Sequence, residues 1–270
     1  ERHIAKRLGI EPAQVRLVAG DSDQTPGLVA TVASRSTMMV GSAAVMACDE
    51  AIRRGYQLAA LVMEAAPEDV EFDQGCYRVV GTDQVVPLLD LTARLASRGS
   101  VPEDLPASLD NVAKFVSSGM TFPNGCHVAE VEIDPATGIT DVVSYWAVDD
   151  LGRVISPHLV RGQVHGGVVQ GWGQAFCEQV VYDEQGQLLS GSFSDYAMPH
   201  LGCMPTIRNE TVQVDTQWNL LGAKGVGESG CTGSMPALAN AMMSALRPFG
   251  VKAMDMPFTA AKVWAALHPS

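Results

Sequence analysis

The sequence has few basic residues, no long hydrophobic run and no metal-binding pattern of cysteines. It carries 18 Lys and Arg against 30 Asp and Glu, which gives a formal net charge of −12. Because a nucleic-acid surface needs clustered basic residues, nucleic acid is not expected as a partner. No apolar segment reaches the roughly 18 residues that a membrane-spanning helix requires, so no membrane span is expected.

The cysteines lack the spacing of a zinc site or an iron-sulfur cluster, since there is no C-x-x-C and no Cys/His pair at ligand spacing. No protein ligand to a metal is therefore predicted. Apolar flanking residues predict buried, reduced thiols and a reducing, cytoplasmic compartment. The first ten residues resemble the middle of a helix and contain no Met, so we expect the chain to begin inside a larger polypeptide. The six cysteines are Cys48, Cys76, Cys126, Cys177, Cys203 and Cys231.

The sequence contains alternating helix and strand signals over 270 residues, of which 47% are hydrophobic. In the first half, Gly9 and Gly55 are expected to stop two helices. The expected elements are helices over 1–8 and 36–54, a short strand over 15–20, and a hairpin followed by a helix within 70–91.

After Thr121 the apolar and polar residues alternate with period two, which predicts antiparallel strands around a turn at 134–138. Ser234 and Thr259 are expected to cap the last two helices, with Pro236 in the first turn of the earlier one. Antiparallel hairpins interleaved with helices predict an α+β fold. The further elements expected are a helix over 157–179, a hairpin over 182–191, a strand near 208–215, and helices over 234–246 and 257–268.

A glycine-rich loop, GAKGVGESGCTG, holds five glycines in the twelve residues from Gly222 to Gly233 and surrounds Lys224 and Glu228. It contains G-x-G-x-x-G, but no strand directly precedes it and no acidic residue follows after about 20 positions, so a dinucleotide fold is the minor reading. Lys224 is followed by Gly, which excludes a P-loop. Composition alone leaves two readings of Glu228 equally open: a base beside a closely approached ligand, or a solvated residue in a turn.

The stretch from Gly222 to Leu246 resembles the C-terminal signature of the molybdenum-binding subunits of the xanthine dehydrogenase and aldehyde oxidase family. Similarity covers nearly the whole chain and is weakest over 70–118. The resemblance implies two molybdopterin-binding subdomains, the end of the first over 1–118 and the second over 119–270. The other segments that match in order are 20–48, 149–178, 191–199 and 256–267.

The same resemblance implies roles for individual residues. Glu228 would be the general base that removes a proton from a hydroxyl on molybdenum, in a site enclosed enough to raise its pKa. Hydroxyl residues at the start of a helix would bind the pterin and its phosphates, although plain helix capping is an alternative. Gln163 would contact the pterin, the alternative being a helix-surface residue. The implied cofactor-binding residues are Ser34, Arg35, Ser36, Thr37, Gln163, Lys224, Gly225, Val226 and Gly227.

Several cofactors and partners follow from the resemblance as well. The cofactor would be molybdopterin with Mo, in its cytosine dinucleotide form, with 2Fe-2S and FAD on partner subunits or domains. The substrate would be a small aldehyde or N-heterocycle, oxidised with oxygen from water. The upstream half of the family's subunit has no counterpart here, so we expect either a fragment or a separately encoded half of a split subunit, inactive in isolation and with an exposed apolar face. Alternatives are a non-catalytic cofactor-binding module, against which the intact Glu228 counts, and an enzyme that binds a nicotinamide nucleotide.

Overall fold

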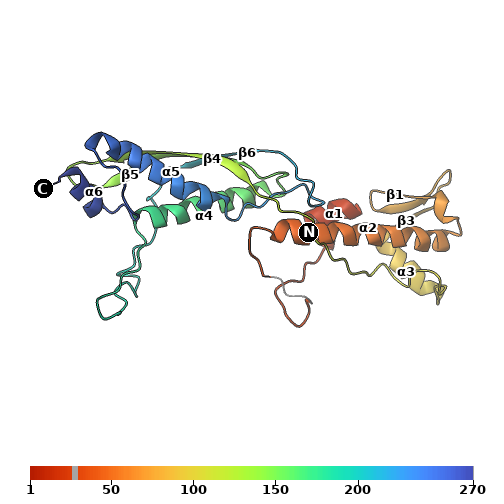
Figure 1. The fold of residues 1–270 in the computed structure, drawn as a ribbon. Coiled ribbons are helices and arrows are strands. Elements are labelled where there is room, and N and C mark those ends of the chain that lie inside the picture. The colour runs from red at the N-terminus through yellow and green to blue at the C-terminus, as the bar shows by residue number, and fades with distance from the viewer. Residues whose placement is uncertain (26–29, 270) are drawn as a thin grey trace. The chain divides into compact units, whose positions relative to one another are not determined.

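The computed structural model describes residues 1–25 and 30–269, and the chain forms two compact units (Figure 1). The first unit comprises residues 1–31, 36–118 and 219–221. The second comprises residues 32–35, 119–218 and 222–270. Among the described helices, none combines the length and the apolarity needed to cross a membrane.

The first unit packs three helices with a small antiparallel sheet in the order β1-β2-β3. The expected helix over 1–8, which ends at a left-handed Gly9, and the expected hairpin with its following helix are confirmed. The strand expected over 15–20 is wrong: no strand forms there, and Leu17 and Val18 are exposed, because no neighbouring strand pairs with this segment. The elements are α1 (Arg2–Leu8), α2 (Ser36–Met63), β1 (Val70–Asp73), β2 (Cys76–Val79), β3 (Val85–Pro87) and α3 (Leu88–Arg98).

Helix α2 runs through Gly55, so the stop expected at that residue is wrong. A Cβ atom on Gly55 would lie 1.8 Å from the Tyr77 hydroxyl oxygen. The Tyr77 ring is fully buried, and its hydroxyl donates a hydrogen bond to the Ile52 carbonyl over 3.1 Å. The glycine therefore allows the β2 tyrosine to reach the helix backbone, and it does not end the helix.

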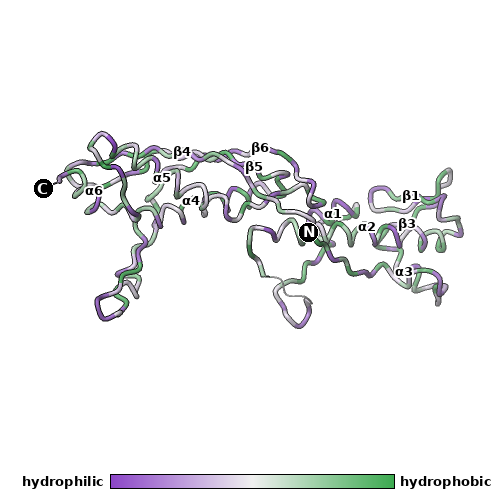
Figure 2. The backbone as a smooth tube through the Cα atoms, viewed as in Figure 1, coloured by the Kyte–Doolittle hydropathy of each residue, from purple (hydrophilic) through white to green (hydrophobic). Residues whose placement is uncertain are grey.

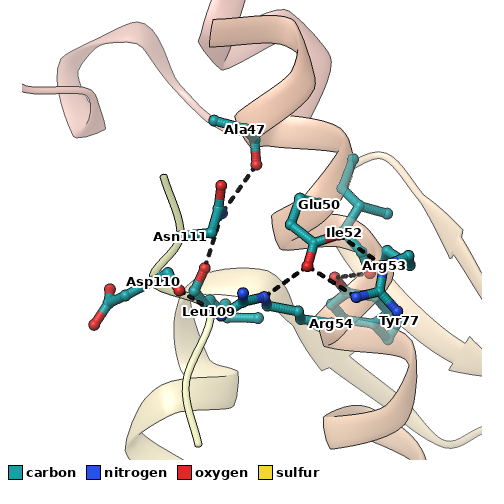
Figure 3. A network of polar contacts seen from close by, with 9 residues as sticks. All are labelled: Ala47, Glu50, Ile52, Arg53, Arg54, Tyr77, Leu109, Asp110 and Asn111. Atoms are coloured by element: carbon teal, nitrogen blue, oxygen red, sulfur yellow. Dashed lines mark hydrogen bonds and ion pairs between the residues drawn. The ribbon is translucent and has the colours of Figure 1, made fainter. Parts of the chain in front are cut away.

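Polar contacts tie the outer side of α2 to the chain that leaves α3 (Figure 3). Glu50 accepts hydrogen bonds from both Arg53 and Arg54, which hold the pKa of its carboxyl at about 2. Arg54 also donates to the Asp110 carbonyl, and Asn111 donates to the Ala47 carbonyl over 3.1 Å. These bonds fix the segment around residue 110 against the helix.

The second unit is a three-stranded sheet in the order β4-β5-β6 with two long helices. The antiparallel pair β4 and β5 confirms the hairpin expected around 134–138, whereas β6 pairs with β5 in the parallel direction. The hairpin expected over 182–191 is reduced to one isolated bridge between Tyr182 and Leu188. The elements are β4 (Asn124–Ile133), β5 (Thr140–Asp150), α4 (Pro157–Phe176), β6 (Ile207–Val212), α5 (Ser229–Leu246) and α6 (Ala260–Leu267).

Helices α4 and α5 lie alongside each other and pack with the sheet around one hydrophobic core (Figure 1). Tyr145 of β5, Val168 of α4 and Leu238 of α5 are fully buried in it. Thr259 caps α6 as expected, since its hydroxyl accepts from the Lys262 amide over 3.4 Å. With helices and a small sheet in each unit, antiparallel in the first and mixed in the second, the α+β fold class is confirmed.

The connection between α4 and β6 leaves the helices and returns without regular structure over most of its length (Figure 1). Hydrophobic and hydrophilic residues alternate along it (Figure 2). Phe193 and Leu201 are almost completely exposed, at 90% and 103% of the reference area. This connection therefore carries large apolar side chains that no described residue covers.

All six cysteines are free thiols, but the expectation that they are buried is correct only in part. Cys48 is buried, Cys126 is exposed, and the other four are intermediate. Burial raises the pKa of the Cys48 thiol and that of Cys231. Cys126 lies on β4, where side chains alternate between the core and the solvent face.

Candidate functional site

Helix α5 begins at Ser229, so Glu228 is its N-cap residue and the carboxylate stands at the helix start. The Thr232 amide donates to the Glu228 carbonyl over 2.9 Å, which is the first hydrogen bond of the helix. The expected start at Ser234 is wrong: this residue is buried within the helix, and Pro236 is in the helix interior.

The helix starts early because its first glycine packs closely on α4. A Cβ atom on Gly230 would lie 2.5 Å from the Val164 carbonyl oxygen and 3.0 Å from the Gly167 Cα atom. A Cβ atom on Gly167 would in turn lie 2.8 Å from the Cys231 amide nitrogen. Gly167 of α4 and Gly230 of α5 thus allow two helix backbones to touch.

Ser34 binds Glu228 through both ends of the glutamate. Its hydroxyl accepts a hydrogen bond from the Glu228 amide over 3.0 Å and donates one to the Glu228 Oε2 atom over 2.8 Å. The Ser34 backbone has φ 52°, in the left-handed region that residues with a side chain seldom adopt. Such a conformation costs about 1–3 kcal/mol and often occurs at functional sites.

Two glycines of the loop bring Ser34 and Gln163 to the same place. A Cβ atom on Gly225 would lie 2.7 Å from Ser34 Cβ, so only glycine fits there. A Cβ atom on Gly227 would lie 3.1 Å from Ser34 Oγ and 3.7 Å from Gln163 Oε1. The Gly227 backbone, a hydroxyl, a side-chain amide and the Glu228 carboxylate therefore lie together within the second unit.

This group of polar atoms is open to solvent. Gln163, Gly227 and Glu228 are exposed. Gly162 and Gly166, on the same helix as Gln163, would present a Cβ atom to open space. The enclosure expected around Glu228 is thus not provided by the residues that the structure describes. A ligand can therefore reach the carboxylate, the amide and the bare helix backbone from solvent.

Lys224 holds the start of the loop to the end of β5. Its ammonium group forms an ion pair with the Asp150 carboxylate, and its amide donates to the Leu151 carbonyl over 2.8 Å. Burial raises the pKa of Asp150, but hydrogen bonds from Lys224 and from the Gly152 and Val214 amides outweigh it and keep that pKa below its usual value. The Lys224 ammonium group is therefore already paired within the protein.

The remaining predicted residues are distributed over both units. Ser36 and Thr37 form the first turn of α2 in the first unit. Arg35 lies beside Ser34 in the second unit, and its Nε atom is buried with no hydrogen-bond partner among the described residues. Val226 packs against the core of the second unit. The structure thus brings together Ser34, Gln163, Gly225, Gly227 and Glu228.

Asp150 is a residue that sequence reasoning did not assign to the site. The pair Asp149 and Asp150 suggests a capped strand end, and nothing in the local pattern indicates a lysine 74 residues away. Carboxylates at strand ends are common and do not mark a site. The one sequence feature that suggests an acidic partner is a lysine in a glycine loop with no acidic residue close by on its N-terminal side. Long-range pairing of this kind follows from topology, which the sequence pattern does not specify.

Comparison with known proteins identifies this architecture. The sequence model of the molybdopterin cofactor-binding domain matches residues 2–205. The chain is 32% identical over 264 residues to the carbon monoxide dehydrogenase large chain of Hydrogenophaga pseudoflava, and covers 33% of it with 98% of its own length. It is 32% identical over 258 residues to the nicotine 6-hydroxylase large subunit of Paenarthrobacter nicotinovorans, and covers 32% of that subunit with 95% of its own length.

Among solved structures, a copper- and molybdenum-containing CO dehydrogenase matches with a TM-score of 0.89 at 31% identity, over 99% of this chain and 34% of that one. The chain thus spans about a third of the length of the relatives it matches. The match extends over both units, including the irregular connection between α4 and β6. The chain belongs to the molybdopterin cofactor-binding domain family and corresponds to a portion of the molybdenum-binding subunits of the xanthine dehydrogenase family.

Proposed function

We propose that this chain supplies part of the cofactor site of a molybdenum hydroxylase in which Glu228 is the general base. The observation that carries the proposal is the exposed Glu228 carboxylate at the start of α5, bonded to Ser34 and adjacent to Gln163. The substrate is an aldehyde or an N-heterocycle that is oxidised at carbon. We further propose that residues 1–118 and 119–270 are two molybdopterin-binding subdomains.

The residues present fit a pterin in their chemistry. A pterin offers many hydrogen-bond donors and acceptors on a flat ring, which suit an amide such as Gln163 and an exposed backbone at Gly227. The unpartnered Nε atom of Arg35 is a donor that suits a phosphate group. Open space beside Gly162 and Gly166 leaves the helix backbone accessible to a flat ligand. These observations support the assignment of Gln163, Gly227 and Arg35 as residues that would hold the cofactor.

The role of the protein in the reaction is to hold and move a proton. Conversion of a substrate C–H bond to C–OH with water releases two protons and two electrons. When bound, the molybdenum cofactor supplies the two-electron acceptor. Glu228 accepts, at a carboxylate oxygen, the proton of the hydroxyl that attacks the substrate carbon. Ser34 orients this carboxylate by binding both its Oε2 atom and the amide of the same residue.

The other parts of the proposal concern groups outside this chain. The electrons leave to 2Fe-2S clusters and FAD on partner subunits or domains. The upstream remainder of the molybdenum subunit supplies the other half of the site, and the cofactor is the cytosine dinucleotide form. Matches to chains named as large chains or large subunits support such an assembly. Six free thiols support a cytoplasmic location.

The test is Glu228→Gln in the assembled enzyme, with Glu132→Gln as the matched control. Both substitutions remove one exposed carboxylate, but Glu132 lies on β4 within the antiparallel pair and touches none of the site residues named above. Molybdenum content is measured by mass spectrometry and turnover on a panel of aldehydes and azaheterocycles. Loss of a general base lowers kcat by about 10²- to 10⁴-fold.

We expect full molybdenum content in both variants and loss of turnover in Glu228→Gln alone. Turnover of Glu228→Gln at the wild-type rate would overturn the role of Glu228. Absence of molybdenum and of cytosine nucleotide from the wild-type complex would overturn the cofactor assignment.

A further inference from the structure

A buried polar cluster in the second unit connects the sheet to the helix that carries Glu228. His127 of β4 and Asp149 of β5 each have 4% of their side-chain area exposed, and Tyr145 of β5 is fully buried. His127 Nδ1 lies 2.8 Å from the Tyr145 hydroxyl oxygen, and His127 Nε2 lies 3.3 Å from Asp149 Oδ1. Both nitrogens of one imidazole ring are therefore bonded inside the core.

The chemistry of the partners fixes the direction of these bonds. A carboxylate only accepts, so His127 Nε2 carries the proton that points to Asp149. Burial, and secondly the charge of Asp149, raise the pKa of Tyr145, so its hydroxyl keeps its proton. In the neutral imidazole that carries its proton on Nε2, Nδ1 accepts from this hydroxyl. The Asp149 Oδ2 atom is buried without a partner among the described residues. The histidine is thus the main polar partner of a buried carboxylate, and its ring is held in one orientation.

The ring of His127 rests directly on the backbone of α5. A Cβ atom on Gly233 would lie 2.5 Å from His127 Nδ1 and 2.6 Å from its Cε1 atom. Gly233 is five residues after Glu228, and α5 begins directly after that glutamate. Because an α-helix is rigid, the position of the His127 ring determines the distance between β4 and the first turns of α5.

The same end of β5 also holds the chain before Glu228. Asp150 pairs with Lys224, four residues before the glutamate, while Asp149 supports the ring that contacts Gly233, five residues after it. Two adjacent aspartates of one strand therefore anchor the chain on both sides of the candidate base. The Glu228 side chain itself is bonded to Ser34, which comes from a separate segment.

We propose that His127, Tyr145 and Asp149 form a positioning cluster that sets the placement of Glu228 through Gly233. This inference rests on the proposed function of Glu228. The three residues do not touch the candidate site themselves. They act by fixing where α5 begins.

The test compares Tyr145→Phe with Tyr77→Phe in the assembled enzyme. Each substitution removes one hydroxyl from a fully buried tyrosine. Among the described residues, that hydroxyl bonds to His127 Nδ1 in the case of Tyr145 and to the Ile52 carbonyl in the case of Tyr77 (Figure 3). The readouts are the thermal midpoint, amide hydrogen exchange of the peptide over 222–235, molybdenum content, and kcat and KM.

We expect both variants to lose a similar amount of thermal stability. Only Tyr145→Phe is expected to show faster exchange over 222–235 and a kcat lowered by roughly 10- to 100-fold at unchanged KM, since displaced support for a reacting group has effects of this size. Gly233→Ala is a second variant that keeps all three side chains of the cluster but pushes the His127 ring from the helix. It is expected to give the same exchange and kcat changes.

Equal exchange and equal kcat in Tyr145→Phe and Tyr77→Phe would overturn the positioning role. Failure of the positioning role can be distinguished from failure of the proposed function. If Glu228→Gln is inactive while the two tyrosine variants behave alike, Glu228 is the base and the cluster is merely structural. If Glu228→Gln is fully active, the proposed function fails, and the hydrogen exchange still reports whether the cluster positions α5.

Discussion

At the scale of single residues, four of the five glycines of the loop leave room for neighbouring groups. Gly225 and Gly227 admit Ser34, Gly230 admits α4, and Gly233 admits the ring of His127. A sequence shows that glycine is frequent there, but it does not show which neighbour each glycine accommodates. The family resemblance is therefore the only basis in the sequence for assigning a role to Glu228, and no sequence pattern indicates its bonds to Ser34.

Gly225→Ala is expected to displace Ser34 from Glu228. The added Cβ atom would lie 2.7 Å from Ser34 Cβ and 2.8 Å from the Ser34 carbonyl oxygen, both too close for a real contact. Because Ser34 adopts a strained backbone conformation, we expect its segment to move and the cofactor content of the enzyme to fall by at least about 10-fold, as for lost support around a metal site.

The control for this prediction is Gly191→Ala, whose Cβ atom would meet Leu188 at an ordinary 3.5 Å. Molybdenum per protein is measured for both variants. Full occupancy in Gly225→Ala would show that the contact between Gly225 and Ser34 does not support cofactor binding.

At the scale of elements, local sequence patterns predicted the type of most helices and strands correctly, but their boundaries less well. Helix α1, the hairpin of β4 and β5, and the cap of α6 follow from short-range patterns and are confirmed. The end of α2 and the start of α5 were wrong for one reason. In both places glycine allows a tertiary contact, whereas the sequence pattern suggests a break in the helix.

Gly55→Ala is expected to destabilise the first unit although alanine is the better helix former. Alanine gains about 1 kcal/mol of helix propensity in an open helix. Here the new Cβ atom would lie 1.8 Å from the Tyr77 hydroxyl oxygen, at the end of a rigid ring, and overpacking costs about 1–3 kcal/mol. Urea unfolding measures the difference, and a stabilised variant would show that the tyrosine can move aside freely.

The ion pair between Lys224 and Asp150 predicts a pH-dependent contribution to stability. The pKa of Asp150 is lowered in the folded chain, so its contribution is present above the unfolded value of about 3.9 and is lost as pH falls through the folded pKa. Lys224→Met leaves a mostly buried carboxylate unpaired, which costs about 3 kcal/mol at neutral pH.

We therefore expect the free energies of unfolding of Lys224→Met and wild type to differ from pH 7 down to about pH 4 and to converge below it, as pH falls through the folded pKa of Asp150. Denaturant unfolding at several pH values measures this. A difference that does not shrink below about pH 4 would show that the ion pair is not its cause.

At the scale of the whole molecule, the chain carries apolar surface that its described residues leave uncovered. Phe193 and Leu201 on the connection between α4 and β6 are the most exposed examples in the second unit. Relatives of about three times this length contain further chain that could cover such residues. The resemblance predicted an exposed apolar face, but its location on an irregular connection could not be derived from periodicity.

The isolated 270-residue chain is expected to bind a hydrophobic fluorescent dye and to associate as its concentration rises, because large exposed apolar patches promote both. Phe193→Ser together with Leu201→Ser should lower both signals and leave the secondary structure unchanged. Dye fluorescence and light scattering provide the measurement. Unchanged signals would show that another surface is responsible.

The proposed role of Glu228 is tested most directly by kcat per molybdenum atom in wild type and in Glu228→Gln. If Glu228 is the proton acceptor, the Gln variant holds molybdenum but its kcat is about 10²- to 10⁴-fold lower, because the amide does not replace the carboxylate as a general base. A Gln variant with full molybdenum content and the wild-type kcat would show that Glu228 is not the base.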